Sequence, residues 1–423
     1  MKVSVAGLWH LGTVTAACCA SAGHDVVAFD EDQNVVAGLR NGRLPVDEPG
    51  LSGAISSATL AGKLRFTSDP DDISPCDILW ICYDTPVDEN DKADTEFVHS
   101  RITTLLGAFE KGAIVLISSQ MPVGSTAKLE RSHPRVDFAY SPENLRLGKA
   151  LEAFTKPDRV VVGIRSQEVR ERLSVLFAPF TKNLEWMSVE SAEMTKHALN
   201  AFLATSVAFI NEIATVCEAT GADAQQVERG LKSDVRIGSK SYLHPGGAFA
   251  GGTLARDLIF LVEIGEERCV PTSLFRGVID SNSAHRAWAN RRLSELLGDL
   301  QSKIVAVLGL TYKPGTNTLR RSTAIEICRW LVTMGAAVQA FDPAIDALPH
   351  DLKDVHLMNR AEDALYGADA VLIATPWPEF QSLPPELFLH GMHRALVLDP
   401  NRYLENTFKA QPAVEYYGIG ISQ

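Results

Sequence analysis

The stretch KVSVAGLWHLGTVTAACCASAGHDVVAFD, residues 2–30, decides the fold of this chain. Residues 2–7 are a short apolar strand; a glycine-containing turn, a helix of small residues through Ala20 and a second strand ending on Asp30 follow. A strand, a glycine turn, a helix and a second strand ending in an acid form the βαβ unit typical of dinucleotide-binding domains. The sequence therefore opens with half of a parallel α/β sheet.

The glycine turn departs from the usual fingerprint at its middle position. It runs Gly7-Leu8-Trp9-His10-Leu11-Gly12, so a tryptophan stands where a glycine normally lets the pyrophosphate approach the backbone. Two interpretations stay open: the dinucleotide still binds with Trp9 displaced sideways, or this half no longer binds it. The first is favoured because Asp30 keeps its place as an acceptor for the adenosine ribose, and an acid there disfavours a 2′-phosphate. The predicted cofactor is NAD, held by Gly7, Trp9, His10, Leu11, Gly12 and Asp30.

Further apolar runs predict more parallel strands of the same sheet, at residues 76–83, 113–119, 136–142 and 158–163. Residues suited to a binding site lie at the ends of several of these strands. Because ligands of doubly wound sheets bind beyond the carboxyl ends of the strands, we expect these residues at the cofactor. They are Tyr83, Thr85, Ser119, Gln120 and Glu143.

The same pattern restarts at Lys303. KIVAVLGL is a strand, residues 322–334 are a helix closed by Gly335, and AVQAFDP, DAVLIATPW and ALVLD add three strands. The predicted fold class is α/β, with two Rossmann-like doubly wound domains joined by a long central helix and a helical region. The predicted boundaries are 1–188, 189–297 and 298–423. The crevice between the two doubly wound domains is the predicted ligand site.

The central helix is predicted at residues 191–221, SAEMTKHALNAFLATSVAFINEIATVCEATG. It begins on Ser191, ends at Gly221 and is apolar on nearly every face between residues 198 and 210, which predicts burial on all sides. Lys196 and Asn200 interrupt this surface four residues apart, and therefore on one face. A buried ammonium is costly without a task or a partner. Lys196 is a candidate catalytic base, although a lysine extending toward water beside a core asparagine gives the same pattern.

Composition bounds the class of protein. The 423 residues are too many for one compact core, and a net charge of −12 with no basic stripe argues against a duplex nucleic-acid binder. No uninterrupted apolar run approaches a transmembrane segment, so we expect a cytoplasmic protein with no membrane partner. The seven cysteines show no CxxC spacing, so neither a metal site nor a disulfide framework is expected.

A glycine-rich loop, HPGGAFAGGT at residues 244–253, follows the central helix. Glycine at that density outside a linker predicts close approach of the backbone to a ligand. Further helices are expected from this loop to about Leu297.

Taken together, these motifs resemble those of the UDP-glucose/GDP-mannose dehydrogenase family over essentially the full length. The matching segments are Asp30, Glu48-Pro49-Gly50-Leu51, Thr85-Pro86, Pro122-Val123-Gly124, Ser141-Pro142-Glu143, Lys196 with Asn200, Asp234 with Arg236-Ile237-Gly238, the glycine loop, Asp257, and Gly309-Leu310-Thr311-Tyr312-Lys313-Pro314. The resemblance implies an N-terminal NAD domain, a central dimerisation region, a C-terminal nucleotide-sugar domain and a homodimer. The implied substrate is a nucleotide-diphosphate sugar.

The chain departs from the family pattern at three positions that serve the second half of the family's reaction. Family members usually oxidise a sugar CH2OH to a carboxylate in two hydride transfers, through a cysteine that captures the aldehyde. Thr253 stands in the place of that cysteine, Leu147 in the place of a glutamate that assists water chemistry, and Gln120 in the place of a threonine that orders a water. A threonine hydroxyl is a far poorer nucleophile than a thiolate. The pattern predicts one two-electron oxidation that stops at a carbonyl, more readily a ketone than a free aldehyde.

The residues that the resemblance assigns to alcohol oxidation are retained. Lys196 would take the hydroxyl proton as hydride leaves, as the lysine does in β-hydroxyacid dehydrogenases. Asn200 would hold the developing alkoxide, Asp257 would orient Lys196 or a water, and Thr253 would line the sugar pocket.

The predicted substrate contacts come from several segments. Cations for the diphosphate are expected from Lys313, Arg236, Arg320 and Arg402, although each arginine also fits a solvated surface charge. Two acids of the family's KPNTDD segment are Asn317 and Thr318 here, and the next acid is Arg321, which leaves the identity of the sugar open. The full predicted set is Glu143, Asn144, Leu145, Lys196, Arg236, Tyr242, Leu243, Gly247, Tyr312, Lys313, Arg320 and Arg402.

Two other functions compete with the dehydrogenase. An NAD-retaining epimerase would return the hydride to the other face of the sugar, and a nucleotide-sugar-binding pseudoenzyme would need no buried base. Loss of the acid-forming chemistry suggests a place in modified-sugar biosynthesis, such as antibiotic octose biosynthesis, where similar dehydrogenases occur.

Overall fold

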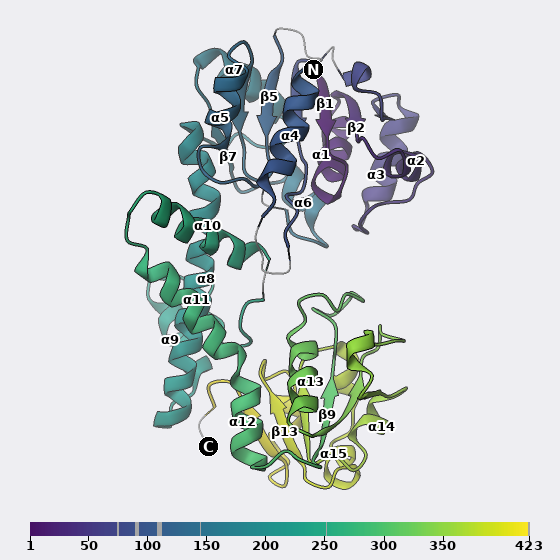
Figure 1. Cartoon of the computed structure of the whole chain (residues 1–423), viewed down its shortest axis with the longest axis vertical. Helices are drawn as coiled ribbons and strands as arrows, with labels where there is room; N and C mark the ends of the chain where they lie inside the picture. Colours follow the sequence, from purple (N-terminus) through teal and green to yellow (C-terminus); the bar gives the residue numbers. More distant parts are fainter. Residues whose placement is uncertain (74–75, 89–92, 108–111, 144, 251, 422–423) are drawn as a thin grey trace. The chain divides into compact units, whose positions relative to one another are not determined.

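A computed structural model describes residues 1–73, 76–88, 93–107, 112–143, 145–250 and 252–421. The chain divides into two compact units, Met1–Leu199 and Asn200–Gln423. Each unit contains one doubly wound sheet, shown in Figure 1 in purple to blue for the first unit and in green to yellow for the second. The predicted α/β class with two Rossmann-like sheets and a long helix is confirmed.

The first sheet has eight strands in the order β3-β2-β1-β4-β5-β6-β7-β8. Their bounds are β1 Lys2–Ala6, β2 Asp25–Phe29, β3 Leu64–Thr67, β4 Ile78–Ile81, β5 Ile114–Ile117, β6 Asp137–Tyr140, β7 Val160–Gly163 and β8 Leu184–Met187. All neighbours are parallel except β6 and β7, where Tyr140 pairs antiparallel with Gly163. The prediction of a parallel strand at 158–163 is therefore wrong in direction. Because β7 starts at the edge of the sheet where β6 ends, the segment that connects these two strands begins and ends at this edge. Glu143 belongs to this segment.

Helices cover both faces of this sheet (Figure 1). One face carries α1 His10–Ser21, α2 Gln33–Arg40, α3 Leu51–Leu60, α6 Ala150–Thr155 and α7 Gln167–Phe177. The other carries the short helix η1 Pro70–Ile73, α4 Thr95–Leu106, α5 Ser125–Ser132 and the start of α8. Along β5, Ile114 and Leu116 enter one core while Val115 and Ile117 enter the other. Two buried faces explain why the strands are continuous apolar runs without polar alternation.

The long helix α8, Val189–Thr220, confirms the central helix predicted at 191–221. It begins two residues earlier than predicted, and the hydroxyl of Ser188 accepts a hydrogen bond from the Ser191 amide at 3.3 Å. The capping role predicted for Ser191 therefore belongs to Ser188. Gly221 ends the helix with φ 83°, as a C-terminal glycine does.

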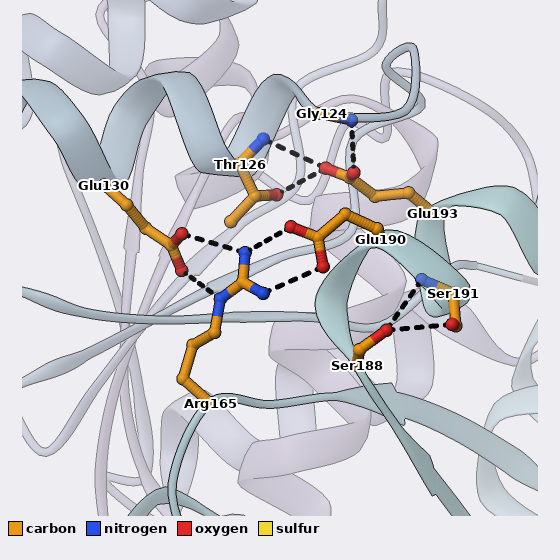
Figure 2. A network of polar contacts seen from close by, with 8 residues as sticks. All are labelled: Gly124, Thr126, Glu130, Arg165, Ser188, Glu190, Ser191 and Glu193. Carbon is orange, nitrogen blue, oxygen red and sulfur yellow. Dashed lines mark hydrogen bonds and ion pairs between the residues drawn. The ribbon is translucent and has the colours of Figure 1, made fainter.

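A buried carboxylate fixes the first turns of α8 to α5 (Figure 2). Glu193 accepts hydrogen bonds from the Gly124 amide at 2.6 Å, the Thr126 amide at 2.9 Å and the Thr126 hydroxyl at 2.7 Å. Gly124 caps α5 with φ 92° and no side chain, so Glu193 supplies the cap from another helix. Burial raises the pKa of Glu193 although these donors favour its ionised form.

A second contact ties the same region to the sheet. The Arg165 guanidinium lies between the carboxylates of Glu130 on α5 and Glu190 on α8, with four hydrogen bonds of 2.6 to 2.9 Å (Figure 2). Its hydrogen bonds to Glu190 and Glu130 raise the pKa of Arg165. The start of α8, and with it Lys196, is thus held against the first sheet.

The prediction that α8 is buried on all sides is wrong. Phe202 is 68% exposed, Phe209 47% and Val216 57%, and they recur every seven residues along one stripe. The opposite side is buried, where Ala204 and Ala208 pack with α10 and α11. By length and composition alone α8 is apolar enough to span a bilayer, contrary to our expectation, but the core helix of a soluble protein passes the same test.

The second unit contains the remainder of α8, a helical region and a six-stranded parallel sheet of order β11-β10-β9-β12-β13-β14. The helical region comprises α9 Ala224–Ser233, α10 Thr253–Glu267, α11 Ser273–Arg286 and α12 Trp288–Leu297. The strands are β9 Ile304–Leu308, β10 Ala337–Phe341, β11 Val355–Leu357, β12 Ala370–Ile373, β13 Leu396–Asp399 and β14 Glu415–Gly418. The other helices are α13 Thr323–Thr333, η2 His350–Leu352, α14 Ala361–Leu365, η3 Pro378–Ser382, α15 Pro385–Gly391 and α16 Glu405–Phe408. One sheet face packs on α8, α12 and α13, and the other on α14 to α16.

Candidate active site

The turn after β1 requires both outer glycines of the fingerprint. Gly7 has φ 91°, and a Cβ there would lie 2.7 Å from the Tyr83 amide nitrogen. A Cβ on Gly12 would lie 1.8 Å from the Gly7 carbonyl oxygen. A side chain on Gly7 would push the turn away from the residue that follows β4. A side chain on Gly12 would push α1 away from the turn. This geometry therefore depends on glycine at both positions.

Trp9 occupies the middle position without backbone strain. Its φ of −81° is ordinary for any residue, and its side chain is half exposed. As the N-cap of α1 it offers no side-chain hydrogen bond, so no side-chain cap occupies the first amides of the helix. Uncapped amides at a helix N-terminus bind phosphate oxygens, so this turn still fits the pyrophosphate of a dinucleotide.

Asp30 directly follows β2 and lies beside this turn. Its carboxylate accepts hydrogen bonds from the Leu8 amide at 2.7 Å and the Asp32 amide at 3.0 Å. A carboxylate has about four acceptor sites, so two of them are left for ribose hydroxyls. Burial raises the pKa of Asp30, and the two amide bonds only partly offset that effect. The residues present therefore fit NAD.

The loops after β4 and β5 lie side by side at the same edge. The Thr85 hydroxyl donates to the Gln120 carbonyl oxygen at 2.5 Å, and Ser119 is buried next to them. The Tyr83 hydroxyl donates to Glu31 at 2.8 Å, next in sequence to Asp30. The structure thus brings the predicted cofactor residues to one edge of the first sheet, and their contact with NAD remains a prediction.

Glu48 joins the cofactor turn to the segment after β6. Its buried carboxylate lies 3.0 Å from His10 Nε2 and accepts the amides of Gly148 at 2.9 Å and Ala150 at 2.7 Å. Burial alone would raise the pKa of Glu48, but these three donors together hold it below the ordinary value. We had not predicted Glu48 as a site residue, although its Glu-Pro-Gly-Leu segment was among the matching motifs.

Lys196 and Glu143 form the candidate base. The Lys196 amine donates to the Glu143 carbonyl oxygen at 2.7 Å and to its carboxylate at 3.1 Å. The other carboxylate oxygen of Glu143 accepts the Leu145 amide at 2.8 Å. Lys196 is only 6% exposed, so the interpretation as a lysine extending to water is not supported. Asn144, predicted beside them, lies outside the described residues.

Asn200 and Asp257 form a second pair, within the second unit. The Asn200 amide donates to the Asp257 carboxylate, and both side chains are buried. Asp257 lies one turn into α10 from Thr253, which is the first residue of that helix. This contact orients the amide of Asn200, a task that we had not predicted for Asp257.

A cavity of about 570 Å³ lies in the second unit between the helical region and the second sheet. It contains five predicted residues, namely Tyr242, Gly247, Thr253, Tyr312 and Lys313. It also contains residues that we had not predicted, among them Phe249, Arg286, Trp288, Arg321, Thr375 and Asn401. Among the described residues that line it there are three Lys or Arg side chains and no Asp or Glu. Such a lining favours an anionic ligand.

Three predicted arginines are not part of this cavity as described. The Arg402 side chain is 4% exposed and is bound to Asp223 at 2.8 Å and to Glu405 at 2.8 Å, so its ion pairs hold the fold, and its contact with the diphosphate stays a prediction. Arg236 is 85% exposed and paired with Asp234. Arg320 is exposed and outside the lining, and Leu243 is buried. The alternative of a solvated surface charge, which applied to each arginine, fits the exposed Arg236 and Arg320 but not the buried Arg402.

No thiol lines the cavity within the described residues. The seven cysteines are all unpaired, and five of them are buried. Burial raises the pKa of Cys18, Cys76 and Cys328, which makes them poor nucleophiles. Cys269 is exposed but lies beyond the far end of α10 from Thr253.

The glycine turn with Asp30 in the first unit and the cation-lined cavity in the second fit an NAD-dependent dehydrogenase built from two Rossmann-like sheets. Three family models match the chain, for the NAD binding, central and UDP binding domains of one family, at residues 1–181, 190–284 and 306–406. The chain belongs to the UDP-glucose/GDP-mannose dehydrogenase family and is an oxidoreductase acting on CH-OH groups.

Individual relatives match over nearly their whole length. A UDP-glucose 6-dehydrogenase of Rhizobium meliloti is 33% identical, with 99% of each chain covered. The structure of a UDP-glucose dehydrogenase from Pyrobaculum islandicum superposes with a TM-score of 0.85 at 29% identity, covering 100% of this chain and 98% of that one. A UDP-D-ManNAc dehydrogenase from Pyrococcus horikoshii gives a TM-score of 0.84 at 25% identity, with 99% of each chain covered.

Proposed function

We propose that this protein oxidises one hydroxyl group of a nucleotide-diphosphate sugar in a single two-electron step and does not form a carboxylate. The observation that carries the proposal is the lining of the cavity, where Thr253 takes the position that the family resemblance assigns to a cysteine and where the described residues include no thiol. Oxidation of an aldehyde to an acid by this route needs a covalent sulfur adduct and an activated water.

The proposed proton path uses Lys196 and Glu143. Lys196 accepts the proton of the substrate hydroxyl, and Glu143, 3.1 Å from the amine, stabilises the ammonium that results. Asn200 donates its amide to the oxygen of the reacting alcohol, and Asp257 holds that amide in place. Bound NAD supplies the hydride acceptor, and Gly7, Gly12 and Asp30 would hold it. Thr253 lines the sugar end of the cavity.

The proposed product is a ketone. A ketone cannot be oxidised again without breaking a C–C bond, so it is a stable end point for a site without a nucleophile. An aldehyde released from the site would be a reactive product. The Leu147 side chain, half exposed, offers no group to activate water at the position where the family resemblance implies a glutamate.

The test is product analysis with a panel of UDP- and GDP-sugars. We expect one equivalent of NADH per sugar and a product two hydrogens lighter than the substrate. Two equivalents of NADH with a uronic acid would refute the proposal, and a changed sugar without NADH would indicate the epimerase. Lys196→Met should lower kcat by about 10²- to 10⁴-fold, the usual contribution of a general base. Lys232→Met, which removes a partly buried lysine of α9 paired with Glu228, is the matched control.

We also propose that the protein is a homodimer that pairs through α8. Phe202, Phe209 and Val216 form a seven-residue repeat of exposed apolar side chains along one side of this helix, which supports pairing there. Two such stripes bury each other by two-fold symmetry. Light scattering after size-exclusion chromatography should give twice the chain mass for the wild type and one chain mass for Phe202→Glu/Phe209→Glu. A monomeric wild type would refute this arrangement.

The proposed setting is the cytoplasm, in modified-sugar biosynthesis such as antibiotic octose biosynthesis. Seven unpaired cysteines support a reducing compartment. A keto sugar is a substrate for amination or reduction, which supports a place before such a step. The three-part division at residues 188 and 297 remains our proposal for the domains.

A further inference from the structure

The cavity of the second unit has one end defined by α10. Thr253 begins this helix, and Asp257, one turn on, holds the Asn200 amide. If the proposed function is correct, the oxygen that reacts lies near Asn200, so the N-terminus of α10 marks the reactive end of the cavity.

The Arg321 guanidinium lies at this end. A Cβ on Gly252, the N-cap of α10, would lie 2.9 Å from Arg321 Nη1. Gly252 has φ 99° and contributes no side-chain cap, so the arginine stands directly beside the helix N-terminus. The first amides of α10 and the guanidinium thus provide two kinds of anion donor side by side at this end of the cavity.

The backbone holds Arg321 firmly in this place. Its φ of 61° lies in the left-handed region, which non-glycine residues with a Cβ rarely adopt. The next residue, Ser322, anchors the turn with its hydroxyl on the Leu310 carbonyl oxygen at 2.6 Å and its amide on the Leu319 carbonyl oxygen at 3.2 Å. Strained residues persist where the surrounding structure fixes them, often at ligand sites.

The charges around Arg321 are also suited to an anion. The described lining contains Arg286, Lys313 and Arg321 but no acid, and Arg286 is paired with Glu326 at 2.5 Å. The first residues of α13, Thr323 and Ala324, line the same cavity, and Ser322 gives that helix no side-chain cap. A second helix N-terminus therefore faces the cavity.

We propose that Arg321 binds an oxyanion of the substrate at the reactive end of the cavity and thereby determines which nucleotide sugars are accepted. Its planar guanidinium is suited to paired hydrogen bonds with a phosphate or a carboxylate. Two sources supply that chemistry: the diphosphate of the nucleotide, or an acidic group carried by the sugar itself. This inference rests on the proposed function in placing a nucleotide sugar in this cavity and its reacting oxygen near Asn200.

The experiment is calorimetric binding of UDP, UDP-glucose and UDP-glucuronate to full-length protein, repeated with GDP and GDP-mannose. The main variant is Arg321→Asn, because asparagine tolerates the left-handed conformation while removing the charge. Arg321→Lys retains the charge without the planar fork. The matched control is Arg329→Gln, an exposed arginine on α13 paired with Asp351 at 2.6 Å. Thermal melting of each variant verifies folding.

Each outcome decides the matter. A tenfold or larger loss of affinity for all ligands in Arg321→Asn, partly restored in Arg321→Lys, assigns the arginine to the diphosphate. A loss confined to UDP-glucuronate assigns it to an acidic sugar. Affinities within twofold of wild type for all ligands, as expected for the control, would overturn the proposal. Because binding is measured without turnover, a protein that proved to form uronic acids would refute the proposed function but leave this assignment standing.

Discussion

The two sheets begin with the same βαβ unit and use it differently. Gly7 after β1 and Gly309 after β9 have φ 91° and 87°. A Cβ on Gly7 would lie 2.7 Å from the Tyr83 amide, and one on Gly309 would lie 2.4 Å from the Thr375 carbonyl oxygen. In each unit an aspartate follows the second strand of this βαβ pattern and lies beside the turn. It is Asp30 in the first unit and Asp342 in the second.

The difference lies in what surrounds the two aspartates. Asp30 accepts two backbone amides, whereas Asp342 accepts five donors. These donors are the Leu310 amide at 2.6 Å, the Thr311 amide at 2.9 Å, the Thr311 hydroxyl at 3.1 Å, the Trp377 indole at 3.0 Å and the Ala344 amide at 2.9 Å. The first unit leaves acceptor capacity for a ligand, and the second uses the acid to hold its own fold.

The loops that follow Gly7 and Gly309 also differ in how they could contact a ligand. Helix α1 begins at His10, directly after the turn, so its N-terminus lies at the cofactor site. Helix α13 begins only at Thr323, and the longer loop from Gly309 brings Tyr312, Lys313 and Arg321 to the cavity. The same βαβ pattern is therefore compatible with two kinds of ligand site, one on a helix N-terminus and one on a longer loop.

The largest effect expected from this comparison is that of Asp342→Ala on stability. Loss of a buried acid with five donors should lower the free energy of unfolding of the second unit by about 5 kcal/mol or more, since each orphaned donor costs about 1–3 kcal/mol. Urea denaturation followed by tryptophan fluorescence measures it. NAD affinity of the folded protein should stay unchanged, and a variant as stable as wild type would break the comparison.

Asp30→Ala should have the opposite profile. We expect NAD affinity to fall about 100-fold, or about 3 kcal/mol, for two lost charge-assisted hydrogen bonds, with a smaller loss of stability than in Asp342→Ala because only two donors lose their acceptor. Fluorescence titration with NADH measures the affinity. Asp32→Ala, which removes the acid that caps α2 next to it, is the control and should bind NADH normally. Normal binding by Asp30→Ala would show that the ribose is held elsewhere.

The pH dependence of NAD affinity provides a smaller and more specific effect. Burial raises the pKa of Asp30, so protonation occurs at a higher pH than for an ordinary aspartate. A protonated carboxyl accepts ribose hydroxyls poorly, so the Kd for NAD should rise as pH falls through that raised pKa. In the free protein the sign is reversed: the contribution of Asp30 to stability is greatest at low pH and is lost as pH rises through its folded pKa. Asp30→Asn should flatten both curves, and curves unchanged in that variant would contradict the assignment.

Trp9→Ala should have the smallest effect. The indole is half exposed and the backbone of Trp9 is unstrained, so the change should alter the Kd for NAD by less than about threefold, within the range of ordinary surface substitutions. The titration used for Asp30 measures it. A large loss would mean that the indole takes part in binding, and a large gain would mean that it obstructs the pyrophosphate.

The sequence predicts the strands at the centre of each sheet better than the strands at its edges. Long apolar runs such as residues 113–119 are strands in the structure, because a strand that is buried on both faces of the sheet is apolar along its whole length. The short strands β3, β8, β11 and β14 were missed because each has only three or four residues and mixed polarity, and pairing with a neighbour makes them strands. The reversed direction of β7 has no local signal, since direction depends on where the preceding segment ends.

The residues of the candidate site were also predicted where a local pattern identifies them and missed where only the fold brings them together. Lys196, Asn200 and Asp257 were predicted because a polar residue in an apolar helix or a fixed motif identifies them. Arg402 looked like a ligand cation, but its partners Asp223 and Glu405 are distant or unremarkable in sequence, and only the fold brings them together. Arg321 was noted as a departure from the family pattern, yet its place beside Gly252 depends on a turn that no pattern predicts.

Glu48 has a consequence for how the first unit opens. Because one carboxylate holds both the His10 ring and the Gly148 and Ala150 amides, the two loops open as one cooperative unit. Amide hydrogen exchange should therefore be slow at both Gly148 and Ala150 and should become fast at both together when Glu48 is replaced by alanine. NAD bound against the turn at His10 would further slow exchange 100 or more residues away in sequence, next to the segment that carries Glu143, the hydrogen-bond partner of Lys196.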